Sequence, residues 1–291
     1  TPLARRLAAE HGIDLMGKTL DAFQLAENVT SNNIANINTP GASQQVVQFG
    51  QAAAISSPSY AAHSSGTVGD GMVVQQIQRI HSDAYDALFR GATSSQNYYN
   101  TEQTALTSIH SSLGDPNSGV STQFTAFQTA SNELVSQTNG SSTSASVNGV
   151  LTQAQALATS LNTAASAIQQ QKTSLVSQAG TLVSTVNGLL DQIAAINGQI
   201  RASTAVGDSP NTLEDQRDNY INQLSQLMDI RVIPGDSNQV SIFTNSGVQL
   251  VGTQAATLNF DAQGTMAPNA LWSADPTKRG VGTLTLTTPT A

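Results

Sequence analysis

Four ionisable residues stand close together in one segment of the chain, Glu214, Asp215, Arg217 and Asp218. Neighbouring carboxylates can act as a general acid and base when their environments separate their proton affinities. Consecutive positions point around a helix, however, and acids in a first helical turn are favoured by the helix dipole while they face water. We therefore interpret the segment as structural, with Arg217 able to bridge to carboxylates on neighbouring helices and with Asp215 as the second ion-pairing residue.

Other residues that could support chemistry do not form a recognisable pattern. The four histidines are scattered, and no two have the i, i+4 spacing of a helical metal site: His11, His63, His81 and His110. Cysteine is absent, which excludes a thiolate metal site and a thiol nucleophile. The sequence also lacks a nucleophile elbow, a Walker loop and a dinucleotide fingerprint. It therefore predicts no catalytic residue, no metal site and no cofactor, and a protein that is not an enzyme.

One long helix is the main element that would position side chains. Its residues recur at spacings that alternate three and four, the pattern of a coiled-coil seam. The seam consists of Leu151, Ala154, Ala158, Leu161, Ala165, Ile168, Lys172, Leu175, Ala179, Leu182, Val186, Leu189, Ile193, Ile196 and Ile200. At ~1.5 Å per residue such a helix is about 75 Å long, which suits a rod. An ordinary bundle would show the same periodicity, and both need an apolar partner helix.

Shorter elements are expected on either side of this helix. Helices are predicted from Ile13 to about Asn36, over 84–113, over 121–137 and over 211–228, the last with Ser209 as N-cap and Pro210 in the first turn. Residues 46–66 are aperiodic and read as a loop or extended arm, and 67–79 as a strand.

Alternating apolar residues from Ile230 onward predict a β domain, with further strand-like pieces at 257–260 and 283–288. The expected fold is mainly α with a β part: a long antiparallel helical bundle followed by the start of a β domain. Its four segments are 1–45 (N-terminal helix and turn), 46–82 (arm and short strand), 83–228 (helical bundle) and 229–291 (incomplete β domain).

Composition restricts the possible partners. Charged residues make up only 10% of the chain, and the formal net charge is −8. Nucleic-acid binding needs clustered Lys and Arg, which are absent here. No apolar run approaches the ~20 residues of a membrane span, and the N-terminus lacks the basic and apolar segments of a signal peptide. The sequence therefore predicts no nucleic-acid partner and no membrane span.

Three asparagines, Asn32, Asn33 and Asn36, occupy the last turns of the first predicted helix, where helix propensity favours other residues. They precede a turn formed by Asn38-Thr39-Pro40-Gly41. Two interpretations stay open for the asparagines. They could satisfy the free carbonyls at the helix end, or they could contact another subunit.

The run from Asn28 to Gly41, NVTSNNIANINTPG, closely resembles the N-terminal signature of the axial proteins of the bacterial flagellum, the rod, hook and hook-associated proteins. The strand at 67–79 is similar to the family's Gly-x-Gly-Val strand that ends in Ile-x-Arg. Leu213 to Asp218 matches a Leu-x-Asp-Gln-Arg-Asp run of the hook-associated members. The resemblance marks Asn32, Asn33, Asn36, Asn38, Thr39, Pro40 and Gly41 as signature or subunit-interface residues.

This resemblance implies a structural subunit that joins hook to filament by helix packing and is exported through the flagellar channel without a cleaved signal peptide. The implied partners are copies of itself in a ring, the hook protein, the next hook-associated protein and an export chaperone. Another hook or rod protein, or a secreted helical adhesin or binding module, remains an alternative. Members of the family end in a helix that pairs with the N-terminal one, and the sequence shows no such helix, so a truncated chain is expected.

Overall fold

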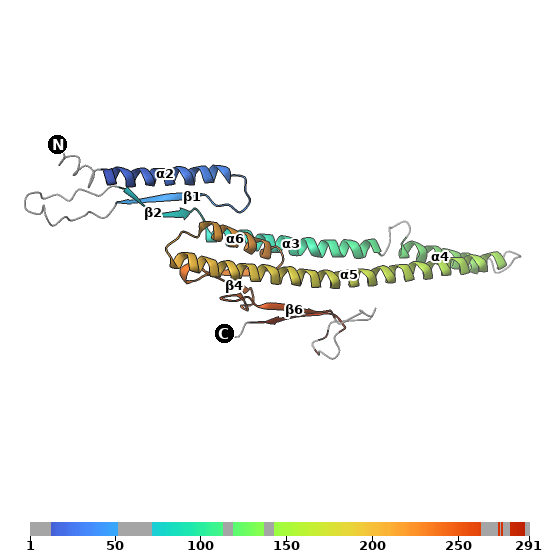
Figure 1. The fold of residues 1–291 in the computed structure, drawn as a ribbon. Coiled ribbons are helices and arrows are strands. Elements are labelled where there is room, and N and C mark those ends of the chain that lie inside the picture. Colours follow the sequence, from blue (N-terminus) through green and yellow to red (C-terminus); the bar gives the residue numbers. More distant parts are fainter. Residues whose placement is uncertain are drawn as a thin grey trace, which may run out of the picture. The chain divides into compact units, whose positions relative to one another are not determined.

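The computed structural model describes residues 13–51, 72–112, 119–136, 143–262, 273, 275 and 280–288. It is mainly helical with small antiparallel sheets (Figure 1), which confirms the predicted fold class. The chain divides into two compact units, each discontinuous in sequence. Unit 1 comprises Thr1–Gly91 and Leu189–Ala255, and unit 2 comprises Ala92–Gly188 and Ala256–Ala291. The predicted segments follow changes in composition, whereas these units join stretches that are distant in sequence.

The helices in the described residues agree with the predicted ones to within a few residues, with one exception. They are α2 (Ile13–Ala35), α3 (Asp83–Ser112), α4 (Val120–Ser136), α5 (Thr143–Ala205) and α6 (Asn211–Ser225). The exception is α5, which begins at Thr143, before the first seam residue Leu151, and reaches 63 residues. The expected cap of α6 is also wrong, because Pro210 is the N-cap residue and no side chain caps this helix. None of the described helices has the length and apolar character needed to cross a bilayer.

Three small antiparallel sheets accompany the helices. Strands β1 (Gln45–Gln51) and β2 (Met72–Arg79) pair from Gln45 opposite Arg79 to Gln51 opposite Met72. A second sheet has the order β3 (Ile230–Pro234), β4 (Val240–Thr244), β5 (Gln249–Val251). The third pairs β6 (Thr257–Asp261) with β7 (Thr283–Thr287). The strands expected from Ile230 onward are thus confirmed.

Strand β1 lies where the sequence predicted a loop or arm. Its segment, QVVQFGQ, has no regular alternation of apolar and polar residues, and its burial pattern is correspondingly irregular. The reason is a change of register between Gln48 and Phe49, which moves the following side chains to the other face. Packing against α2 and pairing with β2 stabilise the strand despite this irregularity.

The core of unit 1 forms where the end of α5 meets α6 and the three-stranded sheet. Its fully buried apolar side chains are Leu190, Ile193, Ile200, Ile221, Leu224, Ile242, Leu250 and Val251. In the same unit, Asn197 of α5 donates to the carbonyl oxygen of Val240 over 2.7 Å and accepts from the Val240 amide over 3.3 Å. This amide pair fixes the sheet against the helix through the backbone of β4.

In unit 2, an asparagine side chain likewise pairs with the backbone of one strand residue and joins α5 to β6. Asn187 donates to the carbonyl oxygen of Leu258 and accepts from the Leu258 amide, both over 2.8 Å. Helix α4 lies beside the first part of α5, because Gln153 lines one hollow together with residues of α4. The β6–β7 hairpin and α4 therefore each cover a limited part of the long helix.

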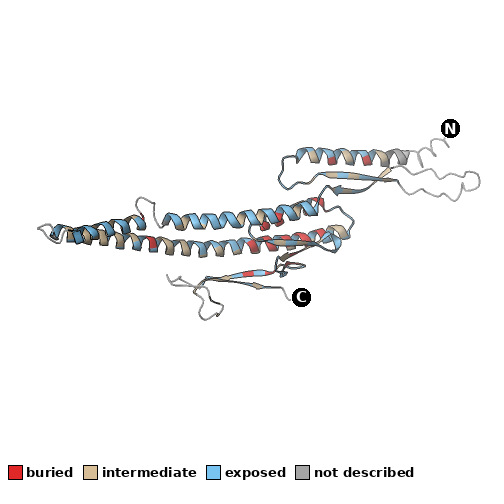
Figure 2. Cartoon of the chain, turned by 180° about the vertical axis from the view of Figure 1, so that it is seen from behind, coloured by how far each residue is buried: buried red, intermediate tan, exposed pale blue. Residues whose placement is uncertain are grey.

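The predicted seam of α5 is buried only in its last part. Buried positions concentrate from Val186 onward, whereas Leu151, Leu161, Leu175 and Leu182 are 37 to 56% exposed (Figure 2). Nearer the start of the helix the sheltered face is offset by one position: Ala164 is buried, and its seam neighbour Ala165 is exposed. Within the described residues, the seam of α5 is therefore sheltered mainly from Val186 onward, and these four leucines before it stay exposed.

Candidate functional site

Polar side chains from β2, α3 and α6 meet in unit 1 around Arg79, the last residue of β2. Its guanidinium contacts three carboxylates of α6: Glu214 through Nε at 2.8 Å, Asp215 through Nη1 at 3.1 Å and Asp218 through Nη1 at 2.6 Å. All four side chains are 10 to 15% exposed. The expectation that these acids face water is wrong, because the end of β2 lies against the first turns of α6.

Helical geometry explains why three acids reach one cation. Glu214 and Asp218 are one turn apart and share a face, and Asp215 lies beside them. Burial by itself lowers the pKa of Arg79, but the charges of Asp218 and Glu214 and the hydrogen bonds to Asp218 and Asp215 raise it more. The pKa is therefore raised, and Arg79 stays a cation.

A second arginine extends the network to α3. Arg90 is buried and donates from Nε to Asn222 over 2.8 Å. Its Nη2 lies 3.2 Å from Asp86 and 3.4 Å from Asp218. Asp218 therefore accepts from both arginines, one from β2 and one from α3. The network fixes the start of α3 and the end of β2 on the same side of α6.

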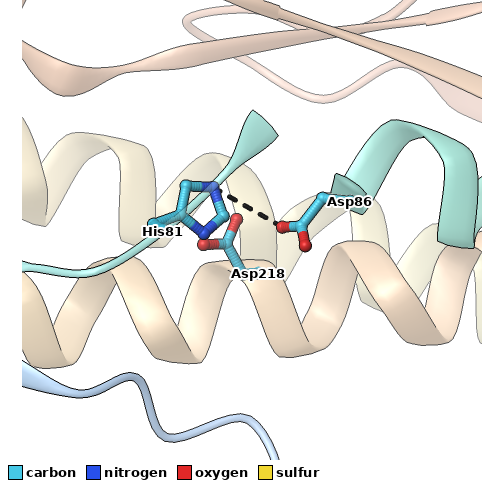
Figure 3. A group of neighbouring side chains, drawn as sticks. All are labelled: His81, Asp86 and Asp218. Atoms are coloured by element: carbon cyan, nitrogen blue, oxygen red, sulfur yellow. Dashed lines mark ion pairs between the residues drawn. The ribbon is translucent and has the colours of Figure 1, made fainter. Parts of the chain in front are cut away.

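Three potential metal ligands lie beside this network, His81, Asp86 and Asp218 (Figure 3). One ligand atom from each lies within 4.8 Å of the others. The His81 Nε2 is 3.5 Å from Asp86 and 2.9 Å from Asp83. Both aspartates of the group already contact Arg90, whose positive charge opposes a metal cation. We therefore interpret the group as part of the ion-pair network. Sequence spacing could not reveal it, because the residues come from three different segments.

Arg217 does not make the predicted ion pair to a neighbouring helix. No salt bridge of this residue exists within the described part of the chain, and Nη1 donates instead to the carbonyl oxygen of Asn238 and to Asn197. The side chain points into the core of unit 1 and is 4% exposed. Burial, together with Arg79 and Arg90, lowers its pKa despite the opposing charges of Asp218 and Glu214. Asp215 does form an ion pair, but with Arg79 from β2.

The predicted signature residues lie next to this network. Asn33 pairs with the backbone of Gln45, donating to its oxygen over 2.8 Å and accepting from its amide over 2.9 Å. Asn36 donates to the Asn32 side chain and to the Asn32 carbonyl, and accepts from Thr39. The Asn32 carbonyl thus accepts from both the backbone amide and the side chain of Asn36, at the end of α2. Asn33 has a different role, because it joins α2 to the start of β1.

The signature turn is anchored on α6. Ser43 donates to Asp215 through its backbone amide over 3.0 Å and through its hydroxyl over 2.6 Å. Gly41 has φ of +84°, which other residues rarely adopt, and its α-carbon faces Asn219 of α6. Asn38, Thr39 and Pro40 are exposed. Asp215 therefore binds both Arg79 and the turn, so it connects the two features.

A cavity of about 890 Å³ lies between the end of α2, the turn, β1 and α6. Its lining includes Asp215 and, of the signature residues, Asn32, Asn33, Asn36, Thr39, Pro40 and Gly41. The carboxylates of Glu214, Asp215 and Asp218 are all paired with the Arg79 guanidinium. The arrangement is suited to holding segments together.

Two family models match parts of this chain. The family model described as the flagellar hook-associated protein FlgK helical domain matches residues 106–284, more than half of the chain. The model of the flagella basal body rod protein matches residues 16–42, which include the signature run up to Gly41. The resemblance drawn from that run is thereby confirmed.

Individual relatives give the same result. Flagellar hook-associated protein 1 of Bacillus subtilis is 31% identical over 223 residues, covering 76% of this chain and 43% of the relative. Its namesake in Salmonella typhimurium is 29% identical over 264 residues, covering 90% and 45%. The chain thus spans less than half the length of these relatives.

A solved structure is also similar, that of the flagellar hook junction protein FlgK from Burkholderia pseudomallei. The TM-score is 0.56 at 26% identity, over 68% of this chain and 32% of that one. Sequence, domain match and fold agree, and the chain therefore belongs to the family of flagellar hook-associated proteins that carry the FlgK helical domain.

Proposed function

We propose that this chain is part of a structural subunit that joins hook to filament in the bacterial flagellum. The observation that carries the proposal is the match of residues 106–284 to the FlgK helical domain. The rod-protein match covers only residues 16–42, so it supports a shared N-terminal signature and does not favour a rod or hook protein over a junction protein.

The mechanism that we propose is burial of apolar helix faces between subunits, without catalysis. Copies of the chain form a ring, and the hook protein and the next hook-associated protein contact it on either side. The exposed leucines of α5 support this mechanism, because apolar side chains in water gain free energy when a partner covers them. The subunit is exported through the flagellar channel without a cleaved signal peptide, and an export chaperone shields it until assembly.

The site around Arg79 has a supporting role in this proposal. Its ion pairs join β2 and α3 to α6, and the hydrogen bonds of Ser43 to Asp215 join the chain after the signature turn to α6. A subunit that joins two parts of the flagellum needs the segment that carries the signature to be held firmly to the helices of unit 1. Buried ion pairs and bidentate hydrogen bonds supply directional contacts for this purpose.

Deletion of the gene in the source bacterium tests the function. The expected phenotype is loss of attached filaments with hooks still present, together with release of filament protein into the medium. Restoring the gene should return attached filaments, and immunogold labelling should mark a narrow band between hook and filament. Filaments that stay attached in the deletion strain would contradict the proposal.

A further inference from the structure

Asparagine is followed directly by glycine at three places in α5. The pairs are Asn148-Gly149, Asn187-Gly188 and Asn197-Gly198. Packing does not require the glycine after Asn187, because a Cβ added to Gly188 would meet open space. Alanine would fit there and would favour the helix. The glycine therefore has no structural reason that the fold supplies, and its chemical effect on Asn187 becomes relevant.

An asparagine that precedes glycine can lose its side-chain amide without an enzyme. The backbone nitrogen of Gly188 attacks Cγ of Asn187, and a new C–N bond closes a succinimide ring. The bond from Cγ to Nδ2 breaks, and Nδ2 leaves as ammonia with the proton that the attacking amide gives up. Water then opens the ring to aspartate or isoaspartate. The reaction consumes water and releases ammonia, so it needs no oxidant or reductant. Glycine permits the attack best, because it has no side chain to hinder it.

Two features of the folded chain oppose this attack at Asn187. The helical ψ of Asn187 directs the Gly188 nitrogen away from Cγ, and the helix holds that N–H in its own hydrogen-bond ladder. In addition, Nδ2 donates to the carbonyl oxygen of Leu258 and Oδ1 accepts from the Leu258 amide, both over 2.8 Å. The reaction therefore requires α5 to unwind at Gly188 and β6 to leave Asn187.

Such an opening is favoured at this place in unit 2. Strand β6 belongs to a sheet of only two strands, which has little stability of its own. Besides the Asn187 pair, β6 meets α5 where the ring of Phe260 faces Gly180. Gly188 is exposed, and the compact unit ends directly after it. Exposed segments next to helix-weakening glycines open at a lower free energy than the whole domain.

We propose that Asn187 is a site of spontaneous deamidation, closed while β6 is docked on α5 and open when β6 leaves it. The product has a carboxylate where Asn187 had an N–H donor, so it repels the Leu258 carbonyl oxygen. Because ammonia has left, the reaction does not reverse, and a transient release of β6 becomes permanent. This inference goes beyond the proposed function and does not depend on it.

Asn197 provides an internal comparison in unit 1. It also precedes a glycine and pairs with one strand residue, Val240. It is 1% exposed, however, and its Oδ1 also accepts from Nη1 of Arg217 over 3.4 Å. A carboxylate at this position would gain a charged partner in Arg217. We therefore expect Asn197 to react more slowly than Asn187 and with less effect on its strand.

Ageing of the chain in mildly alkaline buffer tests the site, with peptide mapping by mass spectrometry and labelling of isoaspartate by its methyltransferase. In concentrated urea, Asn148, Asn187 and Asn197 should react at similar rates, because each follows a β-branched residue and precedes glycine. In native buffer, Asn187 should react at least about tenfold more slowly than in urea, but faster than Asn197. A native rate at Asn187 equal to that in urea, or no higher than that at Asn197, would overturn the proposal.

A glycine substitution tests the chemical route. Gly188→Ala should lower the rate at Asn187 about tenfold or more, because the added methyl group hinders the attacking nitrogen. Gly198→Ala is the matched control, since it makes the same change in the same helix, and it should leave the rate at Asn187 unchanged. Undiminished product at Asn187 in the Gly188→Ala chain would exclude attack by the glycine nitrogen and overturn the proposal.

The effect of the product on β6 is tested with Asn187→Asp. Hydrogen exchange of the Leu258 amide should become about tenfold faster or more, because the strand loses its donor from α5. Asn148→Asp is the matched control, since Asn148 is exposed on the same helix and the change in charge is equal. Equal exchange of the Leu258 amide in the two variants would overturn the conclusion that the product keeps β6 off α5.

Discussion

Replacement of Arg79 by methionine tests whether the ion-pair network holds unit 1 together. Arg79→Met keeps much of the side-chain volume and removes the cation that three carboxylates share, Glu214, Asp215 and Asp218. These groups are at most 15% exposed, so water compensates the loss poorly. Breaking a buried pair by removing one partner costs about 3 to 5 kcal/mol. For a unit of this size each kcal/mol lowers Tm by about 2 to 4 °C, so we expect a decrease of roughly 6 to 20 °C.

Thermal unfolding followed by circular dichroism gives Tm, and hydrogen exchange shows where the change occurs. We expect lost protection in α6 and in the β1–β2 pair, with unit 2 unaffected. Arg201→Met is the matched control, because Arg201 is exposed on α5 and its removal changes the net charge equally. A Tm decrease no larger than that of the control, or a loss of protection confined to unit 2, would refute the reasoning.

Five further substitutions test the packing of the chain by its melting temperature and hydrogen exchange. Ile193→Asp should unfold unit 1, because Ile193 is fully buried. Leu182→Asp should change the free energy of unfolding of the single chain by less than about 1 kcal/mol, because Leu182 is 47% exposed. Equal effects would show that both positions are buried. Gly41→Ala should lower the free energy of unfolding by about 1 to 2 kcal/mol, because Gly41 has a positive φ. Gly91→Ala should raise it by about 0.5 to 1 kcal/mol, because Gly91 lies within α3 with open space around it. Asn33→Ala should lower the free energy of unfolding by about 1 to 3 kcal/mol and speed the hydrogen exchange of the Gln45 amide, the first of β1. Unchanged exchange of that amide would contradict the role of Asn33 in joining α2 to β1.

Periodicity in the sequence was enough to predict most elements. Pro210 at the start of α6 and the change from helical to strand period at Ile230 locate the ends of the neighbouring helices to within a few residues. Strand β1 was missed because its register change removes the alternation that identifies a strand. The burial of α5 was only partly predictable, since a seam pattern says that a face can be covered and not which segment covers it.

The site around Arg79 could not be predicted from spacing alone. Arg79 and Asp218 are 139 residues apart, and a single sequence contains no signal that pairs them. Local reasoning then gave two errors. It assigned the first turn of α6 to solvent, and it expected Arg217 to bridge to a neighbouring helix, although that side chain faces the core. Which cation meets which carboxylate depends on the path of β2, and that path is a property of the tertiary fold.

The asparagines show how a protein with so few charges can attach small sheets to long helices. Asn33 and Asn197 in unit 1 and Asn187 in unit 2 each donate to and accept from one strand residue, so each side chain replaces a neighbouring strand. A primary amide carries an N–H donor and a C=O acceptor side by side, which matches the C=O and N–H of one strand residue. A carboxylate at these positions would repel the strand carbonyl, and an alanine would leave two backbone groups without a partner. Asparagine is therefore required at these positions by hydrogen bonding, although helix propensity favours almost any other residue there.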